Sequence, residues 1–390
     1  MNASSKQSKP LSAPDLESGL DALFRRALDG GVFLGASILV MAGSNPPTIR
    51  NYGHATPGGS AVADSTRFDL ASLTKPLVTV PLVMTAVARG MVGLDDPLDR
   101  FFPPDSVPSE KKGIRVRHLL SHSSGLPPYV EFFRTLIGLP PDKRKEALVR
   151  MIMDAPLIYS PGSSEDYSDL GYMLLGMILE QVFGARLDRL AEEILFGPLG
   201  VGALNFRPLR TGCDPAAVPP ASSAEAAMDS VYAVTENCPW RKRLLRGEVD
   251  DENAWCLDGV AGHAGLFGTA FGVFSLVSSL WDIYRGRIDD PLRPRDLLRL
   301  FWTHTAPKSR WTLGFDTPSR PNSSSGRYFS LNSVGHLGFT GTSFWLDLEQ
   351  ELMVVLLTNR VYPSRENDRL KSFRPIVHDA VMEALGRTGV

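Results

Sequence analysis

The sequence has few of the features that mark several common classes of protein. Only three of its 390 residues are cysteines, and Cys213, Cys238 and Cys256 form no C-x-x-C pair. The sequence therefore predicts neither a disulfide framework nor a zinc knuckle. Its 41 Lys and Arg residues nearly balance 43 Asp and Glu residues, for a formal net charge of -2. Without a basic excess to hold a phosphate backbone, we expect no nucleic-acid partner.

Long hydrophobic runs are also missing. The most apolar stretches, 32–42 and 76–88, are shorter than the roughly 18 residues needed to span a bilayer. No apolar segment directly follows Lys6 and Lys9, as a secretory signal requires. We therefore expect a cytoplasmic protein with no membrane partner and a disordered N-terminus over residues 1–11.

Three well-known catalytic signatures are absent as well. The sequence has no G-x-S-x-G elbow, no H-E-x-x-H pair and no Gly-Lys of a phosphate loop. These absences exclude the α/β-hydrolase, zincin and P-loop classes. His118 and His122 are spaced four residues apart, but no acidic or Cys partner has matching spacing. We predict no metal and no cofactor.

What the sequence does contain predicts an α/β (α+β) fold. With 43% hydrophobic residues, the chain can bury a large core, and its length allows two or three domains. Periodic apolar residues predict a helix over 16–28, strands over 32–41 and 48–54, and a second strand-rich end. That end consists of strands 311–315, 342–346 and 353–358, then a helix over 376–385. The segment between the two ends is mostly helical.

The simplest architecture joins both ends of the chain into one layer. Residues 12–70 and 290–390 would form an α/β domain, an antiparallel sheet flanked by the N- and C-terminal helices. Residues 71–289 would form an inserted, mostly helical domain.

A candidate nucleophile lies in the segment Ser72-Leu73-Thr74-Lys75, which opens a long apolar helix. Residues i and i+3 share a helix face, so the Lys75 amine can lie beside the Ser72 hydroxyl. A serine hydroxyl needs such a neighbouring base, and the Ser72 N-H at the helix start can stabilise an oxyanion. Alternatively, Ser72 is a simple N-cap. A second S-x-x-K at Ser109–Lys112 lies in a Pro-rich loop.

Three further motifs follow in order, at 117–126 (RHLLSHSSGL), 167–176 (YSDLGYMLLG) and 335–342 (GHLGFTGT). Together with Ser72-x-x-Lys75 they resemble the serine β-lactamase-related family, meaning class C β-lactamases, D-alanyl-D-alanine carboxypeptidases and related esterases. The resemblance runs from about residue 32 to about residue 363. It implies a β-lactamase/transpeptidase-like fold. Residues 247–254 and 259–267 look like a subgroup near the penicillin-binding-protein-like esterases.

The resemblance implies roles for the second motif. Tyr167 takes the place of the family's tyrosine, whose phenolate acts with the lysine on the nucleophile's proton. Lys75 would favour that charged form. A buried capping Tyr167 is the structural alternative, and a different register would make Ser168 the proton shuttle. In the preferred register Asp169 replaces the family's usual Asn, so it can accept from Lys75 but donates no amide N-H to a substrate.

The third motif aligns with the family's K-T-G strand. His336, Leu337 and Gly338 would line the cleft, with the Phe339 N-H as the second oxyanion donor beside Ser72. Leu337 replaces a Thr whose hydroxyl binds the substrate carboxylate, and Leu offers no polar group. A cross-strand packing role is the alternative for His336.

These residues predict a serine hydrolase that forms an acyl-enzyme on Ser72, with Lys75 and Tyr167 moving the proton. Leu337 and Asp169 favour esters or small amides over β-lactams. A D-alanyl-D-alanine carboxypeptidase or weak β-lactamase is the alternative within the same chemistry, and a catalytically silent scaffold is the alternative outside it. The expected partner is a small-molecule ester, amide or β-lactam substrate, and the sequence leaves the oligomeric state open.

Overall fold

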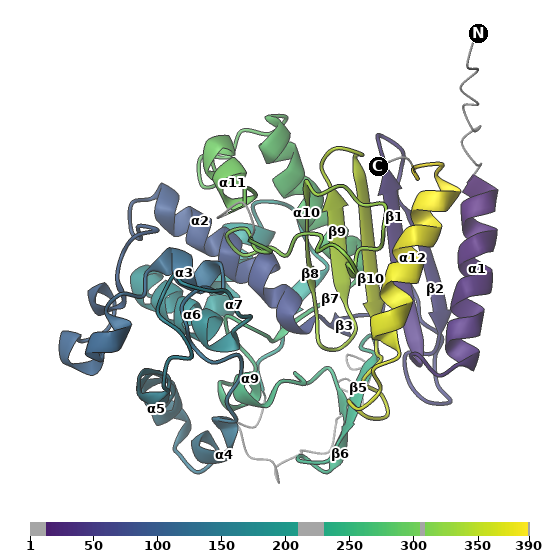
Figure 1. Ribbon diagram of the computed structural model, residues 1–390. Helices are drawn as coiled ribbons and strands as arrows, with labels where there is room; N and C mark the ends of the chain where they lie inside the picture. The colour runs from purple at the N-terminus through teal and green to yellow at the C-terminus, as the bar shows by residue number, and fades with distance from the viewer. Residues whose placement is uncertain (1–12, 210–229, 305–308, 389–390) are drawn as a thin grey trace.

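A computed structural model describes residues 13–209, 230–304 and 309–388 (Figure 1). The N-terminus over 1–11, predicted to be disordered, lies outside the described residues. The main sheet has five antiparallel strands in the order β2-β1-β10-β9-β8. Their bounds are β1 Gly35–Ala42, β2 Thr48–Gly53, β8 Ser333–Leu337, β9 Ser343–Asp347 and β10 Leu352–Thr358.

The predicted joining of the two chain ends is confirmed, because β1 pairs directly with β10, Ala36 opposite Thr358. One predicted strand, 311–315, is wrong. This segment makes only isolated bridging contacts, since Gly314, at a φ of 104°, turns the chain and the Thr312 N-H donates to the Phe315 carbonyl at 3.0 Å. Positive φ is a conformation that glycine adopts easily. The third C-terminal strand is β8 instead.

Helices cover both faces of the sheet (Figure 1). On one face lie α1 (Ala13–Asp29) and α12 (Leu370–Ala384), which pack against each other. The ring of Phe24 stacks on Tyr52 at 4.3 Å and meets Phe373 edge-on. On the other face, α10 (Ala270–Arg285) contacts β1 and β10. A strand whose side chains alternate between two covered faces is buried throughout, as β1 is over its first seven residues.

The residues between β2 and β8 are mostly helical and add two small sheets, β3-β7-β4 and β5-β6. The strands are β3 Phe68–Asp69, β4 Leu204–Phe206, β5 Val234–Cys238, β6 Arg243–Arg246 and β7 Leu266–Gly268. The longer helices are α2 Val80–Ala88, α5 Pro141–Asp154 and α6 Asp169–Phe183. The shorter ones are α3 Val116–Leu120, α4 Phe133–Leu136, α7 Leu187–Leu190, α9 Glu252–Cys256 and, after α10, α11 Arg295–Phe301.

The helix that follows β3 carries the Ser-x-x-Lys segment into the core. A 3₁₀ turn (η1, Ala71–Leu73) and a π turn (η2, Lys75–Thr79) lead into α2. Counted together, Ala71–Ala88 reaches the 18 residues of a membrane span, longer than the apolar run alone suggested. It is 83% buried inside the protein, as expected of a core helix. The proposed domain boundaries at residues 70 and 290 remain a prediction. Helix α10 belongs to the proposed inserted domain, yet it packs on the sheet.

Candidate active site

The turn before Ser72 is strained and held in place. Ala71 has a φ of 48°, a left-handed conformation that costs a residue with a Cβ roughly 1–2 kcal/mol. The Asp69 carboxylate at the end of β3 accepts the Ala71 N-H at 2.8 Å. Its other oxygen accepts the Asp250 N-H at 2.7 Å. This carboxylate therefore fixes the start of the helix that presents Ser72.

Ser72, Lys75 and Tyr167 meet at one point. The Lys75 Nζ donates to the Ser72 Oγ at 2.9 Å, and the Tyr167 hydroxyl donates to the same oxygen at 2.7 Å. Lys75 reaches Ser72 across one helical turn, whereas Tyr167 comes from the residues just before α6. The other two predicted catalytic residues are thus both within hydrogen-bond distance of the Ser72 Oγ.

Lys75 is fully buried, and its ammonium has two further acceptors. Its Nζ lies 2.7 Å from the Asp169 Oδ1 and 3.2 Å from the His263 carbonyl oxygen. Burial lowers the pKa of Lys75, and the Asp169 carboxylate opposes that shift. The balance leaves an amine that gives up its proton more readily than an ordinary lysine.

Tyr167 differs from the electrostatic expectation. Burial, with the Asp169 carboxylate, raises the pKa of Tyr167 well above its usual range, so the phenol keeps its proton at rest. The sequence suggested that Lys75 would favour the phenolate, but desolvation of the buried ring outweighs that attraction. The His122 ring packs 4.6 Å from the Tyr167 ring and accepts the Ser168 N-H. His122 therefore helps to orient Tyr167.

Ser168, the alternative proton shuttle, points elsewhere. Its Oγ donates to the Pro127 carbonyl at 2.7 Å, and the residue is 1% exposed. The geometry favours the register in which Tyr167 contacts the nucleophile.

The peptide after β8 is oriented from behind. The Arg374 guanidinium, on α12, donates to the Gly338 carbonyl at 3.1 Å. In a planar trans peptide the C=O and the next N-H point in opposite directions, so the Phe339 N-H points away from Arg374. The Phe339 carbonyl accepts from the Arg360 Nε at 2.8 Å. Two arginines thus fix the peptides on both sides of Phe339. The Ser72 N-H lies in a first helical turn and has no helical acceptor, so it is free to bind a substrate oxygen.

His336 and Leu337 lie on opposite faces of β8. The His336 Nδ1 lies 2.8 Å from the Leu337 carbonyl, and burial lowers the pKa of His336 to about 3, so the ring is neutral. Nδ1 then carries the proton, and Nε2 is an acceptor with no partner among the described residues. Leu337 lines the cavity and also packs on the apolar cluster beneath α12.

Side chains that could replace the missing Thr hydroxyl are committed elsewhere. The Thr340 Oγ1 donates to the Asp69 carbonyl at 2.7 Å, and the Thr342 Oγ1 to the Leu70 carbonyl at 3.0 Å. The Arg360 NH1 donates to the Asn367 carbonyl, in addition to the bonds of Arg360 to Phe339. These bonds join the end of β8 to the strand before Ser72 and leave the Leu337 position without a polar substitute.

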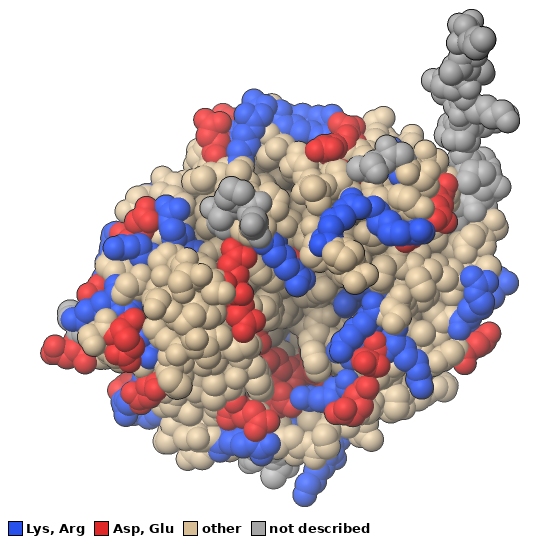
Figure 2. Space-filling view, viewed as in Figure 1, with Lys and Arg blue, Asp and Glu red and all other residues tan. Residues whose placement is uncertain are grey.

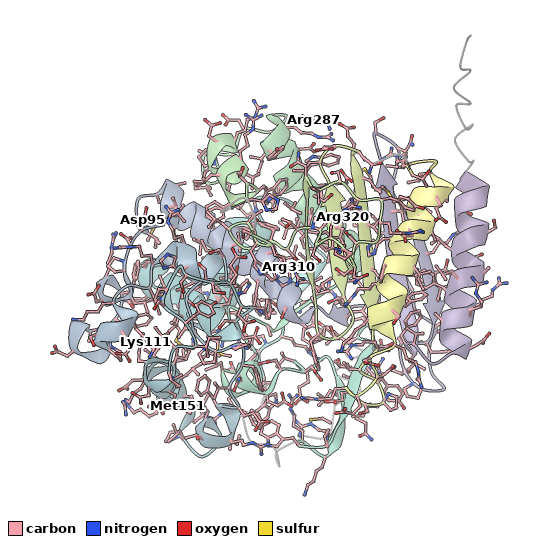
Figure 3. The ribbon with its side chains drawn as sticks, in the orientation of Figure 1. Asp95, Lys111, Met151, Arg287, Arg310 and Arg320 are labelled. Atoms are coloured by element: carbon pink, nitrogen blue, oxygen red, sulfur yellow. The ribbon has the colours of Figure 1, made fainter. Side chains whose placement is uncertain are left out.

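A cavity of about 620 Å³ contains the site. It lies between the helical region and the β8 edge, where Figure 2 shows the surface hollowed with charges of both signs at its rim. Arg310, labelled in Figure 3, lines this cavity and pairs with Asp316 at 2.8 Å.

The second Ser-x-x-K is not part of the cavity: Ser109–Lys111 is a separate 3₁₀ turn. Within residues 13–209, 230–304 and 309–388, no group of three His, Cys, Asp or Glu residues is arranged to hold a metal ion.

Several residues of the site were missed by the sequence analysis. Asp69 and Arg374 act through backbone groups, and nothing in a single sequence marks such a role. Asp251 accepts from the His263 Nε2 at 2.9 Å and also caps α9. It therefore holds His263, whose carbonyl contacts Lys75, against the cavity wall. The N-cap pattern Asp-x-x-Ala was the one readable signal.

The fold and this site define a serine hydrolase built around a Ser-x-x-Lys segment. The chain belongs to the Beta-lactamase family, whose family model matches residues 20–374. A protein of Escherichia coli K12 named "Putative D-alanyl-D-alanine carboxypeptidase" is 31% identical over 76% of this chain and 69% of its own length. A Bacillus subtilis protein named N-acetylmuramyl-L-alanine amidase is 31% identical over 76% and 68%.

Solved structures share the fold. EstCE1, described as a hydrolase with promiscuous acyltransferase activity, has a TM-score of 0.69 at 21% identity, covering 94% of this chain and 98% of its own. The octameric penicillin-binding protein homologue from Pyrococcus abyssi has a TM-score of 0.67 at 19% identity, covering 95% and 79%. The predicted family and fold class are thereby confirmed.

Proposed function

We propose that this serine hydrolase acts through an acyl-enzyme on Ser72 and prefers carboxylic esters or small amides. The observation that carries the proposal is the convergence of Lys75 and Tyr167 on the Ser72 Oγ, at 2.9 and 2.7 Å. A serine needs a base within this distance to attack a carbonyl at neutral pH.

Acylation begins with Lys75 as its neutral amine. As the Ser72 Oγ bonds to the substrate carbonyl carbon, its proton passes to the Lys75 Nζ, and the ammonium that forms is stabilised by Asp169. The substrate oxygen, now negative, accepts from the Ser72 and Phe339 N-H groups. When the bond to the leaving group breaks, the proton moves to the leaving oxygen or nitrogen, with the neutral Tyr167 hydroxyl as the neighbouring donor.

Deacylation repeats these steps with water. The water loses one proton to the same Lys75 and Tyr167 pair and bonds to the acyl carbon. The Ser72 Oγ leaves and regains a proton, and the carboxylic acid is released. No atom outside the chain, substrate and water is required.

The substrate preference follows from the third motif. A substrate carboxylate entering the cavity would meet Leu337, with the Thr340 and Thr342 hydroxyls already bonded to backbone carbonyls. A charge that loses water without gaining a partner is strongly disfavoured, whereas a neutral ester has no such requirement. The neutral His336 ring in place of the family's lysine acts in the same direction.

A D-alanyl-D-alanine carboxypeptidase activity is the second candidate. The name of the Escherichia coli relative favours it. Lys371 and Arg310, whose side chains are exposed and line the cavity, are cations that could meet a carboxylate there.

Intact-mass spectrometry distinguishes these functions. After incubation with a fluorophosphonate, we expect one covalent adduct on the wild type and none on Ser72→Ala. Parallel incubation with penicillin tests β-lactam recognition. Ser72→Ala should also lose p-nitrophenyl acetate turnover while its Tm stays within a few degrees. Labelling at Ser109 or Ser121, or full turnover by Ser72→Ala, would overturn the assignment, and a catalytically silent scaffold predicts no adduct at all.

A further inference from the structure

The cavity that contains Ser72 is also lined by a buried carboxyl group without a partner. Asp250 is 3% exposed, and its Oδ1 has no hydrogen-bond partner among the described residues. A buried polar atom left unpaired costs free energy, more so for a charged group, so its position in a binding cavity points to a ligand. The Asp69 carboxylate binds the backbone N-H of Asp250, which places Asp250 beside the turn that presents Ser72.

The charges of Arg365, Arg241 and Arg360 act on this carboxyl, but within the described part of the chain none of the hydrogen bonds of these arginines reaches its side chain; Arg360 bonds to the Phe339 and Asn367 carbonyls. The Arg365 guanidinium bonds to Glu236 and Glu252, at 2.8 and 2.7 Å. Arg241 donates to the Val249 carbonyl at 2.6 Å and to the carbonyl, not the side chain, of Asp250. One further ligand group is therefore needed to complete the surroundings of Asp250.

The chemistry of the surrounding wall favours a cation. Burial, followed by the charges of Glu236 and Asp69, raises the pKa of Asp250 well above its usual range. The negative potential that opposes ionisation of Asp250 is the potential that attracts a positive group beside it. Further acidic side chains and two aromatic rings, which bind ammonium groups through their faces, line the same part of the cavity. These are Glu131, Asp251, Glu252, Tyr129 and Phe133.

We propose that Asp250 is a specificity-determining residue that binds a primary ammonium group on the acyl part of the substrate. The inference rests on the proposed ester and amide hydrolysis and deepens it, since it names aminoacyl esters or amides as the substrate class. The acyl part is assigned because the leaving group needs the proton donor Tyr167, whose ring packs against the rings of His122, Trp311 and His336. Asp250 is bonded instead to the Asp69 turn.

Two esters of matched shape test this assignment. Ethyl 4-aminobutanoate and ethyl pentanoate differ only in an ammonium group in place of a methyl group. We expect the wild type to hydrolyse the amino ester with kcat/KM at least about ten-fold higher, the size of one hydrogen bond to a charged group. Asp250→Asn should remove this preference. Glu146→Gln, at an exposed carboxyl on α5 that pairs with Arg150 outside the cavity, should keep it.

Binding without turnover separates this inference from the proposed function. In the Ser72→Ala background, butylammonium should raise the Tm and butan-1-ol should not, and adding Asp250→Asn should abolish the shift. Asp250→Asn alone should be at least as stable as the wild type, because it removes a buried unpaired carboxyl. An equal rate for the two esters, or a preference or Tm shift that survives in Asp250→Asn, would overturn the inference. If neither ester is cleaved, the Tm shift alone decides it.

Discussion

At the scale of the residue, the site depends on a competition between burial and charge. Lys75 and Tyr167 are both enclosed, and enclosure disfavours the charged form of each group, so the amine becomes a better base and the phenol a weaker acid. Burial therefore shifts both groups around Ser72 toward their neutral forms. The sequence predicted the three residues that meet at the Ser72 Oγ, because they belong to ordered motifs. It gave the wrong charge to Tyr167, because the depth of burial is a property of the fold.

Lys75→Ala and Tyr167→Phe should each lower kcat for p-nitrophenyl acetate by about two orders of magnitude or more, the usual range for lost acid-base catalysis. Their effects should not add in the double variant, because both groups act on one proton. Steady-state kinetics of the two single variants and the double variant measure this. Full activity in Tyr167→Phe together with loss in Ser168→Ala would restore the other register.

Asp169→Asn, which introduces the family's usual residue, should change the pH dependence. Activity rises with pH as Lys75 loses its proton, so the rising limb follows the pKa of Lys75, which burial has already lowered. The Asp169 charge raises that pKa, and its removal should therefore move the rising limb of kcat/KM to lower pH. A Ser163→Ala variant, outside the cavity, serves as the control. A limb that stays in place or moves upward would mean that Lys75 is not the base.

At the scale of the element, both ends of the chain could be read from the sequence, and the connections could not. The helix over 16–28 and the strand over 353–358 lie within α1 and β10, because their apolar periodicity reflects a face that the sheet buries. The segment 311–315 is as apolar as a strand but closes a turn at Gly314. Arg241 is 4% exposed, because its guanidinium donates to buried carbonyls, a role that no sequence pattern reveals.

Leu337→Thr tests what β8 contributes to specificity. One hydrogen bond to a charged group predicts a gain of about ten- to a hundred-fold in kcat/KM for penicillins or D-Ala-D-Ala peptides, with little change for esters. Valine has the shape of threonine without the hydroxyl, so Leu337→Val should gain no activity toward these substrates. Both variants should lose some stability, because Leu337 packs on the cluster beneath α12. Wild-type protein that already cleaves penicillin faster than esters would contradict this account of β8.

At the scale of the whole molecule, the candidate active site lies at the interface between the β8 edge of the sheet and the helical region. Thr340 and Thr342 bond across it to the strand that precedes Ser72, and Asp69 bonds onward to the Asp250 segment. The Phe339 peptide and Ser72 therefore lie on opposite sides of one hydrogen-bonded contact. A change of pH that alters the charge of a group in this contact should therefore change both the stability and the activity of the protein.

Asp69 is such a group, and it predicts a pH dependence of the free energy of unfolding. Burial raises the pKa of Asp69 to about 6, so between about pH 4 and 6 the folded protein binds more protons here than the unfolded chain. Its contribution to stability should fall as pH rises through this window, by up to roughly 3 kcal/mol. Urea unfolding of wild type and Asp69→Asn from pH 4 to 7 isolates the contribution. A difference between the two that is constant with pH would refute it.

The pairing of β1 with β10 also determines when the main sheet can form during translation. Ala36 meets Thr358 only after about 320 further residues have been translated, at least some 15 s at roughly 5–20 residues per second. Until then the β1-β2 hairpin leaves the ribosome with one edge unpaired, and the apolar side chains of β1 have no sheet to cover them. The helical region can pack earlier, from local contacts. The nascent protein thus carries an exposed, aggregation-prone edge through most of its translation.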